Sequence, residues 1–154
     1  MDISIVIPTR DRSMLLNELL VSLGQSTPSL EGVEIIVIDN GSTDETQMIC
    51  QARSGEFENF QYIFEPKVGL HNARHAGFRN ASGPVIAYLD DDTRVGQAWL
   101  SGIRETYDDN SVGLAGGMNL PDFETEPPDW VNDLISYIDK GWFVMPFSIL
   151  NCGT

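Results

Sequence analysis

Positive charge is scarce in this sequence. Nine lysines and arginines stand against 23 aspartates and glutamates over 154 residues, which gives a formal net charge of -14. A chain so acidic has no overall field that would attract the phosphates of nucleic acid or an anionic membrane surface. We therefore expect a protein that does not bind nucleic acid.

Long apolar segments are also missing. No run approaches the roughly 18–20 apolar residues of a membrane-spanning helix. Met1 leads straight into a strand-like segment, without the basic and apolar regions of a signal peptide. We expect a cytoplasmic protein without a transmembrane segment, and peripheral attachment to a membrane through a further segment stays open.

The motifs of several common enzyme classes are absent. The two cysteines, Cys50 and Cys152, lack the paired spacing of a zinc or redox motif, so we interpret them as buried or indifferent thiols. There is no Gly-x-Gly-x-x-Gly or Walker pattern, and no serine lies in a nucleophile elbow. These absences weigh against dinucleotide-binding, P-loop and serine-hydrolase enzymes.

What the sequence does contain is a repeated alternation of short apolar runs with helical patterns. The run 33–39 includes four successive β-branched residues, as in a central parallel strand that is covered on both faces. Leucines recur at helical spacing between residues 13 and 24. Such alternation with short connections predicts an α/β fold, a mostly parallel Rossmann-like sheet flanked by helices. The predicted strands are 3–7, 33–39, 60–64, 84–89 and 112–120, and the predicted helices are 13–24, one from the turn 41–44 to about 54, 70–80, 97–107 and 130–140.

Basic residues gather where these strands end. In a doubly wound sheet, ligands bind beyond the carboxyl ends of the strands. Four of the few basic residues follow a predicted strand, and a fifth, Arg74, lies early in the helix 70–80. This concentration of cations in an acidic protein predicts an anionic ligand such as a diphosphate. The four residues are Arg10, Arg12, Lys67 and Arg94.

The strongest single feature is a run of three carboxylates, Asp90, Asp91 and Asp92, directly after the strand 84–89. Adjacent carboxylates repel one another, and a divalent cation relieves that repulsion. Mg²⁺ typically takes one or two carboxylates together with phosphate oxygens of the substrate. These residues alone fit a metal site and a solvated acidic turn equally well, and the nearby cations favour the metal site.

Two further polar features have local explanations as well. Asp39 ends the strand 33–39, where it can accept a hydrogen bond from a ribose hydroxyl or a base N–H, or cap the turn 41–43. His71 and His75 are four residues apart on a predicted helix, a spacing that can bind metal. Without the intervening glutamate of a metalloprotease helix, we favour surface or helix-start roles for both.

Four motifs then stand in a recognisable order. They are Ile5-Val6-Ile7-Pro8-Thr9-Arg10-Asp11-Arg12, Ile36-Val37-Ile38-Asp39-Asn40-Gly41-Ser42-Thr43-Asp44, Gly69-Leu70-His71-Asn72-Ala73-Arg74-His75-Ala76-Gly77 and Leu89-Asp90-Asp91-Asp92. Together, over about residues 3–119, they resemble the family 2 glycosyltransferases, inverting enzymes with the GT-A fold. Gly116 and Gly117 match glycines that are often found on the strand after the last of these motifs.

The resemblance implies a set of nucleotide contacts. Pro8, Thr9 and Arg10 would line the nucleotide pocket. Asp39 would contact the base, and Arg74 would contact the nucleotide. Three positions depart from the residues that are common in the family, which leaves the nucleotide preference open. They are Arg10, Asp11 and His75.

The resemblance also implies a metal site. Asp90-x-Asp92 looks like the DxD motif of the family, so Asp92 would coordinate Mg²⁺ or Mn²⁺ that bridges the diphosphate. Asp90 or Asp91 would then touch the ribose or the sugar.

The implied function is inverting, metal-dependent transfer of a sugar from a nucleotide-diphosphate sugar to an acceptor hydroxyl. A UDP-sugar is favoured as donor, and the acceptor would be a saccharide or lipid-linked. Residues 1–120 would form the nucleotide-sugar-binding region, and 121–154 an acidic, proline-containing loop with the start of the acceptor-binding region. The end of the chain resembles the beginning of a family segment that precedes the catalytic base, so we expect that base beyond Thr154 and little turnover by the chain alone.

Two other functions stay under consideration. One is a non-catalytic module that only binds a nucleotide sugar, which the intact set of Asp39, Arg74 and Asp90-x-Asp92 disfavours. The other is a nucleotidyltransferase, which would carry a glycine-rich and basic loop after the first strand. The segment 8–12 contains no glycine.

Overall fold

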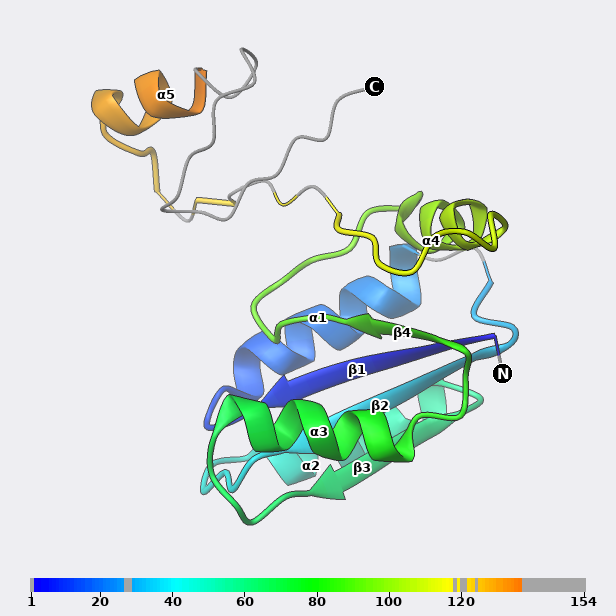
Figure 1. The fold of residues 1–154 in the computed structure, drawn as a ribbon. Helices are drawn as coiled ribbons and strands as arrows, with labels where there is room; N and C mark the ends of the chain where they lie inside the picture. The colour runs from blue at the N-terminus through cyan, green and yellow to red at the C-terminus, as the bar shows by residue number, and fades with distance from the viewer. Residues whose placement is uncertain (1, 27–28, 118, 120–121, 124, 137–154) are drawn as a thin grey trace. The chain divides into compact units, whose positions relative to one another are not determined.

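The computed structural model describes residues 2–26, 29–117, 119, 122–123 and 125–136. The chain divides into two compact units, Met1–Asp108 and Asp109–Thr154. Within the described residues, every helix falls short of the length and apolarity that a membrane span requires. The elements, in chain order, are β1 (Ile3–Thr9), α1 (Ser13–Ser26), β2 (Val33–Asp39), α2 (Thr46–Arg53), the short 3-10 helix η1 (Ser54–Glu56), β3 (Phe60–Phe64), α3 (Leu70–Asn80), β4 (Val85–Tyr88), α4 (Trp99–Tyr107) and α5 (Asp129–Ser136) (Figure 1).

The first unit is built on a four-stranded sheet in the order β3-β2-β1-β4. All three pairings are parallel, with Thr9 of β1 opposite Asp39 of β2 and Val6 opposite Tyr88 of β4. The predicted parallel α/β sheet is therefore confirmed. The strand order reverses between β1 and β4, and such a reversal opens a crevice at the carboxyl ends of the two strands.

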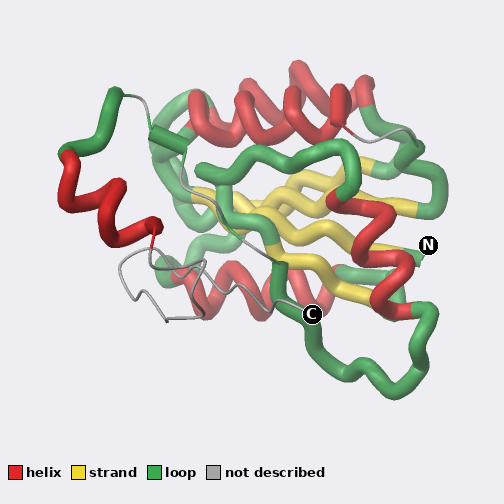
Figure 2. The backbone as a smooth tube through the Cα atoms, turned by 90° about the horizontal axis from the view of Figure 1, so that it is seen from above, coloured by secondary structure: helices red, strands yellow, loops and turns green. Residues whose placement is uncertain are grey.

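Helices cover both sides of this sheet (Figure 2). All residues of β1 and β2 are buried, so successive side chains feed two different cores. On one face, isoleucines of β1 pack with α1, Cys50 of α2 and Leu100 of α4. On the other face, Val6, Ile36 and Ile38 pack against α3.

The α3 helix lies unusually close to the sheet. A Cβ atom built on Gly77 would come within 2.2 Å of Cγ1 of Val6. Ala73 and Ala76 complete the same small-residue face of the helix. Because small residues face β1 and β2 here, the middle of α3 packs closely against these strands.

The amino ends of the strands are joined by a buried carboxylate, Glu34. It accepts hydrogen bonds from the hydroxyl of Ser4, from the backbone N–H and hydroxyl of Ser82 at 2.6 and 2.7 Å, and from the N–H of Gly83 at 3.3 Å. Burial alone would raise the pKa of Glu34, but these hydrogen bonds outweigh burial and hold the pKa below its ordinary value. The network ties β1 and β2 to the loop before β4.

The sequence-based boundaries differ from the structure in a few places. Residues 112–117 form no strand, and most of them are exposed, so the prediction of a strand over 112–120 is wrong for this part. Three glycines among these six residues offer no side chain to pack, which weakens a strand. The predicted helix 130–140 is observed as α5, and residues 137–140 lie outside the described part of the chain.

Candidate functional site

The loops that follow β1 and β2 are locked to one another. The N–H of Asp11 donates to the hydroxyl of Ser42 at 3.0 Å, and the N–H of Thr43 donates to the Asp11 carboxylate at 2.7 Å. Ser13 then donates its N–H to the carboxylate of Asp44 at 2.9 Å. Asp11 adopts a φ of 52°, a left-handed conformation that aspartate tolerates better than most residues. These bonds fix the segment that carries Arg10 and Arg12.

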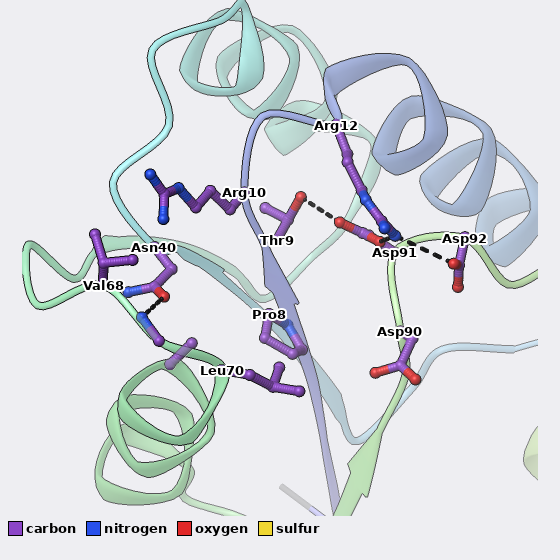
Figure 3. Close-up of a pocket in the computed structure, with 12 residues that line it drawn as sticks. Pro8, Thr9, Arg10, Arg12, Asn40, Val68, Leu70, Asp90, Asp91 and Asp92 are labelled. Atoms are coloured by element: carbon purple, nitrogen blue, oxygen red, sulfur yellow. Dashed lines mark hydrogen bonds and ion pairs between the residues drawn. The ribbon is translucent and has the colours of Figure 1, made fainter.

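A pocket of about 430 Å³ opens at the carboxyl ends of β1 and β4, beside the start of α3 (Figure 3). Its walls come from four segments that are far apart in the sequence: the end of β1, the residue after β2, the start of α3 and the turn after β4. This is the edge of the sheet where the sequence predicts a ligand. The lining residues are Pro8, Thr9, Arg10, Arg12, Asn40, Val68, Gly69, Leu70, Ala73, Asp90, Asp91 and Asp92.

The aspartates after β4 differ sharply in their surroundings. Asp91 is buried, and its two oxygens accept hydrogen bonds from the Thr9 hydroxyl at 2.7 Å and from Nη1 of Arg12 at 3.0 Å. The same nitrogen of Arg12 donates to Asp92 at 3.1 Å. The hydrogen bond to Asp91 and the charges of both carboxylates raise the pKa of Arg12 further above its ordinary value.

Asp90 belongs to a second ion pair, with Arg74 of α3. Nη2 of Arg74 lies 3.2 Å from the Asp90 carboxylate, and the guanidinium lies 5.9 Å from the ring centre of Tyr88. The Tyr88 hydroxyl donates to the backbone carbonyl of Arg74 at 3.1 Å. The sequence predicts Arg74 and Asp90 at one site, and the structure brings them together. Arg74 itself is not among the residues that line the pocket.

Asn40 is a pocket residue for which the sequence suggested no role of its own. Its side-chain amide donates to the carbonyls of Glu65 and Lys67 at 3.1 and 2.8 Å, and its side-chain oxygen accepts the N–H of Gly69 at 2.6 Å. Asn40 therefore shapes the loop that leads into α3. The available signal was its position, since it directly follows Asp39 at the end of a buried strand.

Asp39 lies just outside the lining of this pocket. It is buried, and its carboxylate accepts the N–H of Ser42 at 2.8 Å and the hydroxyl of Tyr62 at 2.6 Å. Burial, together with this hydrogen bond to the carboxylate, raises the pKa of Tyr62 above its ordinary value. Asp39 thus closes the turn after β2, one of the two roles that the sequence allows, and its contact with a base stays a prediction.

The remaining residues singled out in the sequence lie around the pocket rather than in it. Arg94 donates to Glu18 of α1 at 2.7 Å, and Lys67 is not part of the lining. His71 and His75 are both exposed on α3, with ring centres 4.0 Å apart. Cys50 is buried, and burial raises the pKa of its thiol to about 12, as the interpretation of an indifferent thiol requires.

The donor set of the aspartate turn fits a hard divalent cation that also binds a substrate. Over the described residues, no three histidine, cysteine, aspartate or glutamate side chains are grouped closely enough to enclose a metal ion. Asp92 is half exposed and faces the pocket, and Asp90 lies in the same turn. Mg²⁺ and similar ions use one or two carboxylates, several waters and substrate phosphates, so this open arrangement could hold such an ion.

Comparisons with known proteins place the chain in a family. The model of glycosyl transferase family 2 matches residues 4–151. A validoxylamine A glucosyltransferase from Streptomyces hygroscopicus subsp. jinggangensis is 34% identical over 103 residues, which cover 66% of this chain and 24% of that protein. The chain thus spans about a quarter of the length of this relative.

Two solved structures share the fold. The Staphylococcus aureus TarS 1-349 structure in complex with UDP-GlcNAc matches with a TM-score of 0.67 and 21% identity, over 79% of this chain and 37% of that one. The mannosyltransferase PcManGT from Pyrobaculum calidifontis, in complex with GDP-Man and Mn²⁺, matches with a TM-score of 0.67 and 21% identity, over 72% of this chain and 33% of that one. The sheet is that of a GT-A glycosyltransferase, and the chain belongs to glycosyl transferase family 2.

Proposed function

We propose that this chain forms the donor-binding part of an inverting glycosyltransferase, which passes a sugar from a nucleotide-diphosphate sugar to an acceptor hydroxyl. The observation that carries the proposal is the pocket at the reversal between β1 and β4. It combines two arginines with a turn of three aspartates, a pairing suited to a diphosphate and its counter-ion.

Nucleotide-diphosphate sugars are the donors found with structures of the same fold. One of these structures holds UDP-GlcNAc, and another holds GDP-Man with Mn²⁺. We take a UDP-sugar as the first donor to test and a GDP-sugar as the second. Residues 1–120 would bind the donor, and 121–154 would begin the acceptor-binding region.

Each site residue has a role in this proposal. Pro8 and Thr9 form the wall at the end of β1, and Arg10 faces the pocket from the next position. Asp39 and Arg74 would contact the base and the nucleotide, while Asp90 or Asp91 would touch the ribose or the sugar.

Asp92 would hold Mg²⁺ or Mn²⁺ against the diphosphate. The bound metal would neutralise the negative charge that develops on the leaving nucleoside diphosphate. The base that deprotonates the acceptor is not assigned to any of the described residues, and we propose that it lies beyond Thr154. The acceptor would be a saccharide or a lipid-linked molecule.

The test is a calorimetric titration of the chain with UDP and then GDP, with and without Mn²⁺. We expect metal-dependent binding that Asp92→Asn abolishes, because Asn removes the charge and keeps the shape. Asp108→Asn, at an exposed aspartate after α4, is the matched control and should bind like the unchanged chain. Absence of binding to either nucleotide by a folded sample would refute the proposal. Binding without sugar transfer by a longer chain would instead favour the non-catalytic module.

A further inference from the structure

Arg12 makes an unusual double contact for a residue of a binding pocket. It stands between β1 and α1 and reaches the turn after β4, across the point where the strand order reverses (Figure 3). A single nitrogen, Nη1, lies 3.0 Å from a carboxylate oxygen of Asp91 and 3.1 Å from one of Asp92. Arg12 thus offsets part of the negative charge that Asp91 and Asp92 bring to the pocket.

The two contacts differ in strength. The side chain of Asp91 is 7% exposed and also accepts the hydrogen bond from Thr9, so this contact is desolvated and fixed on two sides. The side chain of Asp92 is 53% exposed, and a solvent-exposed ion pair contributes little net free energy. Arg12 is therefore anchored through Asp91, while another ligand can replace its contact with Asp92 at little cost in free energy.

Within the proposed function, a divalent cation is the ligand that would replace Arg12 at Asp92. A divalent cation on Asp92 would lie next to the guanidinium, and like charges at such short range repel. Binding of the cation alone must therefore break or weaken the contact between Arg12 and Asp92. A diphosphate in the same pocket offers Arg12 a new anionic partner, because Arg12 lines that pocket. With both ligands present, Asp92 would pair with the cation, and Arg12 would pair with Asp91 and the diphosphate.

We propose that Arg12 is a built-in counter-cation of the aspartate turn. Arg12 pairs with Asp92 while no donor is bound, and the metal replaces Arg12 at Asp92 when the donor binds. This inference rests on the proposed donor-binding function. It makes Arg12 a positioning residue that couples the two ligands, so that nucleotide strengthens metal binding and metal strengthens nucleotide binding by the same factor.

The chain offers a matched control for this idea in Arg10. It also lines the pocket and carries the same charge, but its guanidinium pairs with Asp11 at 3.4 Å and points away from the aspartate turn (Figure 3). Arg10→Gln and Arg12→Gln therefore remove the same charge from the same pocket. Only Arg12→Gln removes the direct contact with Asp92.

The test measures the affinity for Mn²⁺ by electron paramagnetic resonance, without nucleotide and with saturating UDP. In the absence of UDP, we expect Arg12→Gln to bind Mn²⁺ about fivefold more tightly than Arg10→Gln. This factor corresponds to the free energy of an exposed ion pair, which Mn²⁺ no longer has to break in Arg12→Gln. The strengthening of Mn²⁺ binding by UDP should shrink more in Arg12→Gln than in Arg10→Gln.

The inference and the proposed function can fail separately. Equal Mn²⁺ affinities for the two variants without UDP, or weaker binding by Arg12→Gln, would overturn the role of Arg12 even if UDP binds normally. Failure of UDP to bind would refute the proposed function. Tighter Mn²⁺ binding by Arg12→Gln would then still support the counter-cation role, since this comparison contains no nucleotide.

Discussion

The contact between α3 and β1 can be tested by substituting Gly77 with alanine. A new methyl group would lie 2.2 Å from Cγ1 of Val6 and 3.3 Å from its Cβ and Cγ2. Favourable carbon contacts lie at about 3.5–4.0 Å, so the helix or the strand would have to move. Val6 cannot yield easily, because it is fully buried in a strand that pairs on both sides and its χ1 rotamer is restricted.

The expected cost is the difference between two opposing effects. Overpacking a rigid core costs about 1–3 kcal/mol, and this contact is close enough to take the upper value. Replacing glycine by alanine inside a helix stabilises the helix by about 1 kcal/mol. We therefore expect Gly77→Ala to lower the free energy of unfolding by about 2 kcal/mol, as measured by urea denaturation.

Two further variants make this result interpretable. Gly102 lies inside α4, and a Cβ atom at this position would meet nothing within 4 Å, so Gly102→Ala should stabilise the protein by up to about 1 kcal/mol. In a Val6→Ala background, which removes both γ-methyl groups, Gly77→Ala should cost much less than in the unchanged chain. Equal stabilisation by Gly77→Ala and Gly102→Ala would refute the close packing of α3 on β1.

Two other predictions concern the buried polar residues. The pKa of Glu34 is lowered in the folded chain, so its stabilising effect is complete above the unfolded value of 4.5 and is lost as the pH falls through the lower folded value. Glu34→Gln should lower the free energy of unfolding by about 2 kcal/mol at pH 7, as measured by urea denaturation. It should also make the free energy of unfolding depend less on pH between about pH 5 and pH 3. The same pH dependence in the variant and the unchanged chain would contradict this account. Asn40→Ala removes three hydrogen bonds from the loop before α3 and should cost about 2 kcal/mol and weaken UDP binding at least severalfold. Unaltered UDP affinity in calorimetry would show that this loop does not shape the donor pocket.

Much of the fold could be predicted because its signals are local. The strands 33–39 and 60–64 and the helix 70–80 have the predicted bounds, since β-branched runs and helical spacing are properties of short segments. The edge of the sheet that carries the pocket could be predicted because parallel strands bring their carboxyl ends to one edge. The strand predicted over 112–120 is wrong for residues 112–117, because a run that contains apolar residues forms a strand only if it also finds a partner and a core.

The details of the site could not be read from the sequence in the same way. Asp91 and Asp92 are chemically identical neighbours, yet one is buried beneath Thr9 and the other faces solvent. That difference depends on the path of the turn after β4 rather than on residue type. The bridge from Arg12 to both carboxylates spans about 80 residues of sequence, and no short-range pattern predicts it.

The most direct test of the central claim is to locate the metal by NMR. In the presence of UDP, substoichiometric Mn²⁺ should broaden the amide signals of Thr9 and Asp90 to Asp92, which line the proposed site. The signals of Ser82 and Gly83, at the amino ends of the strands, should stay sharp. Broadening that is centred elsewhere, or spread evenly over the acidic surface, would contradict a donor site at the aspartate turn.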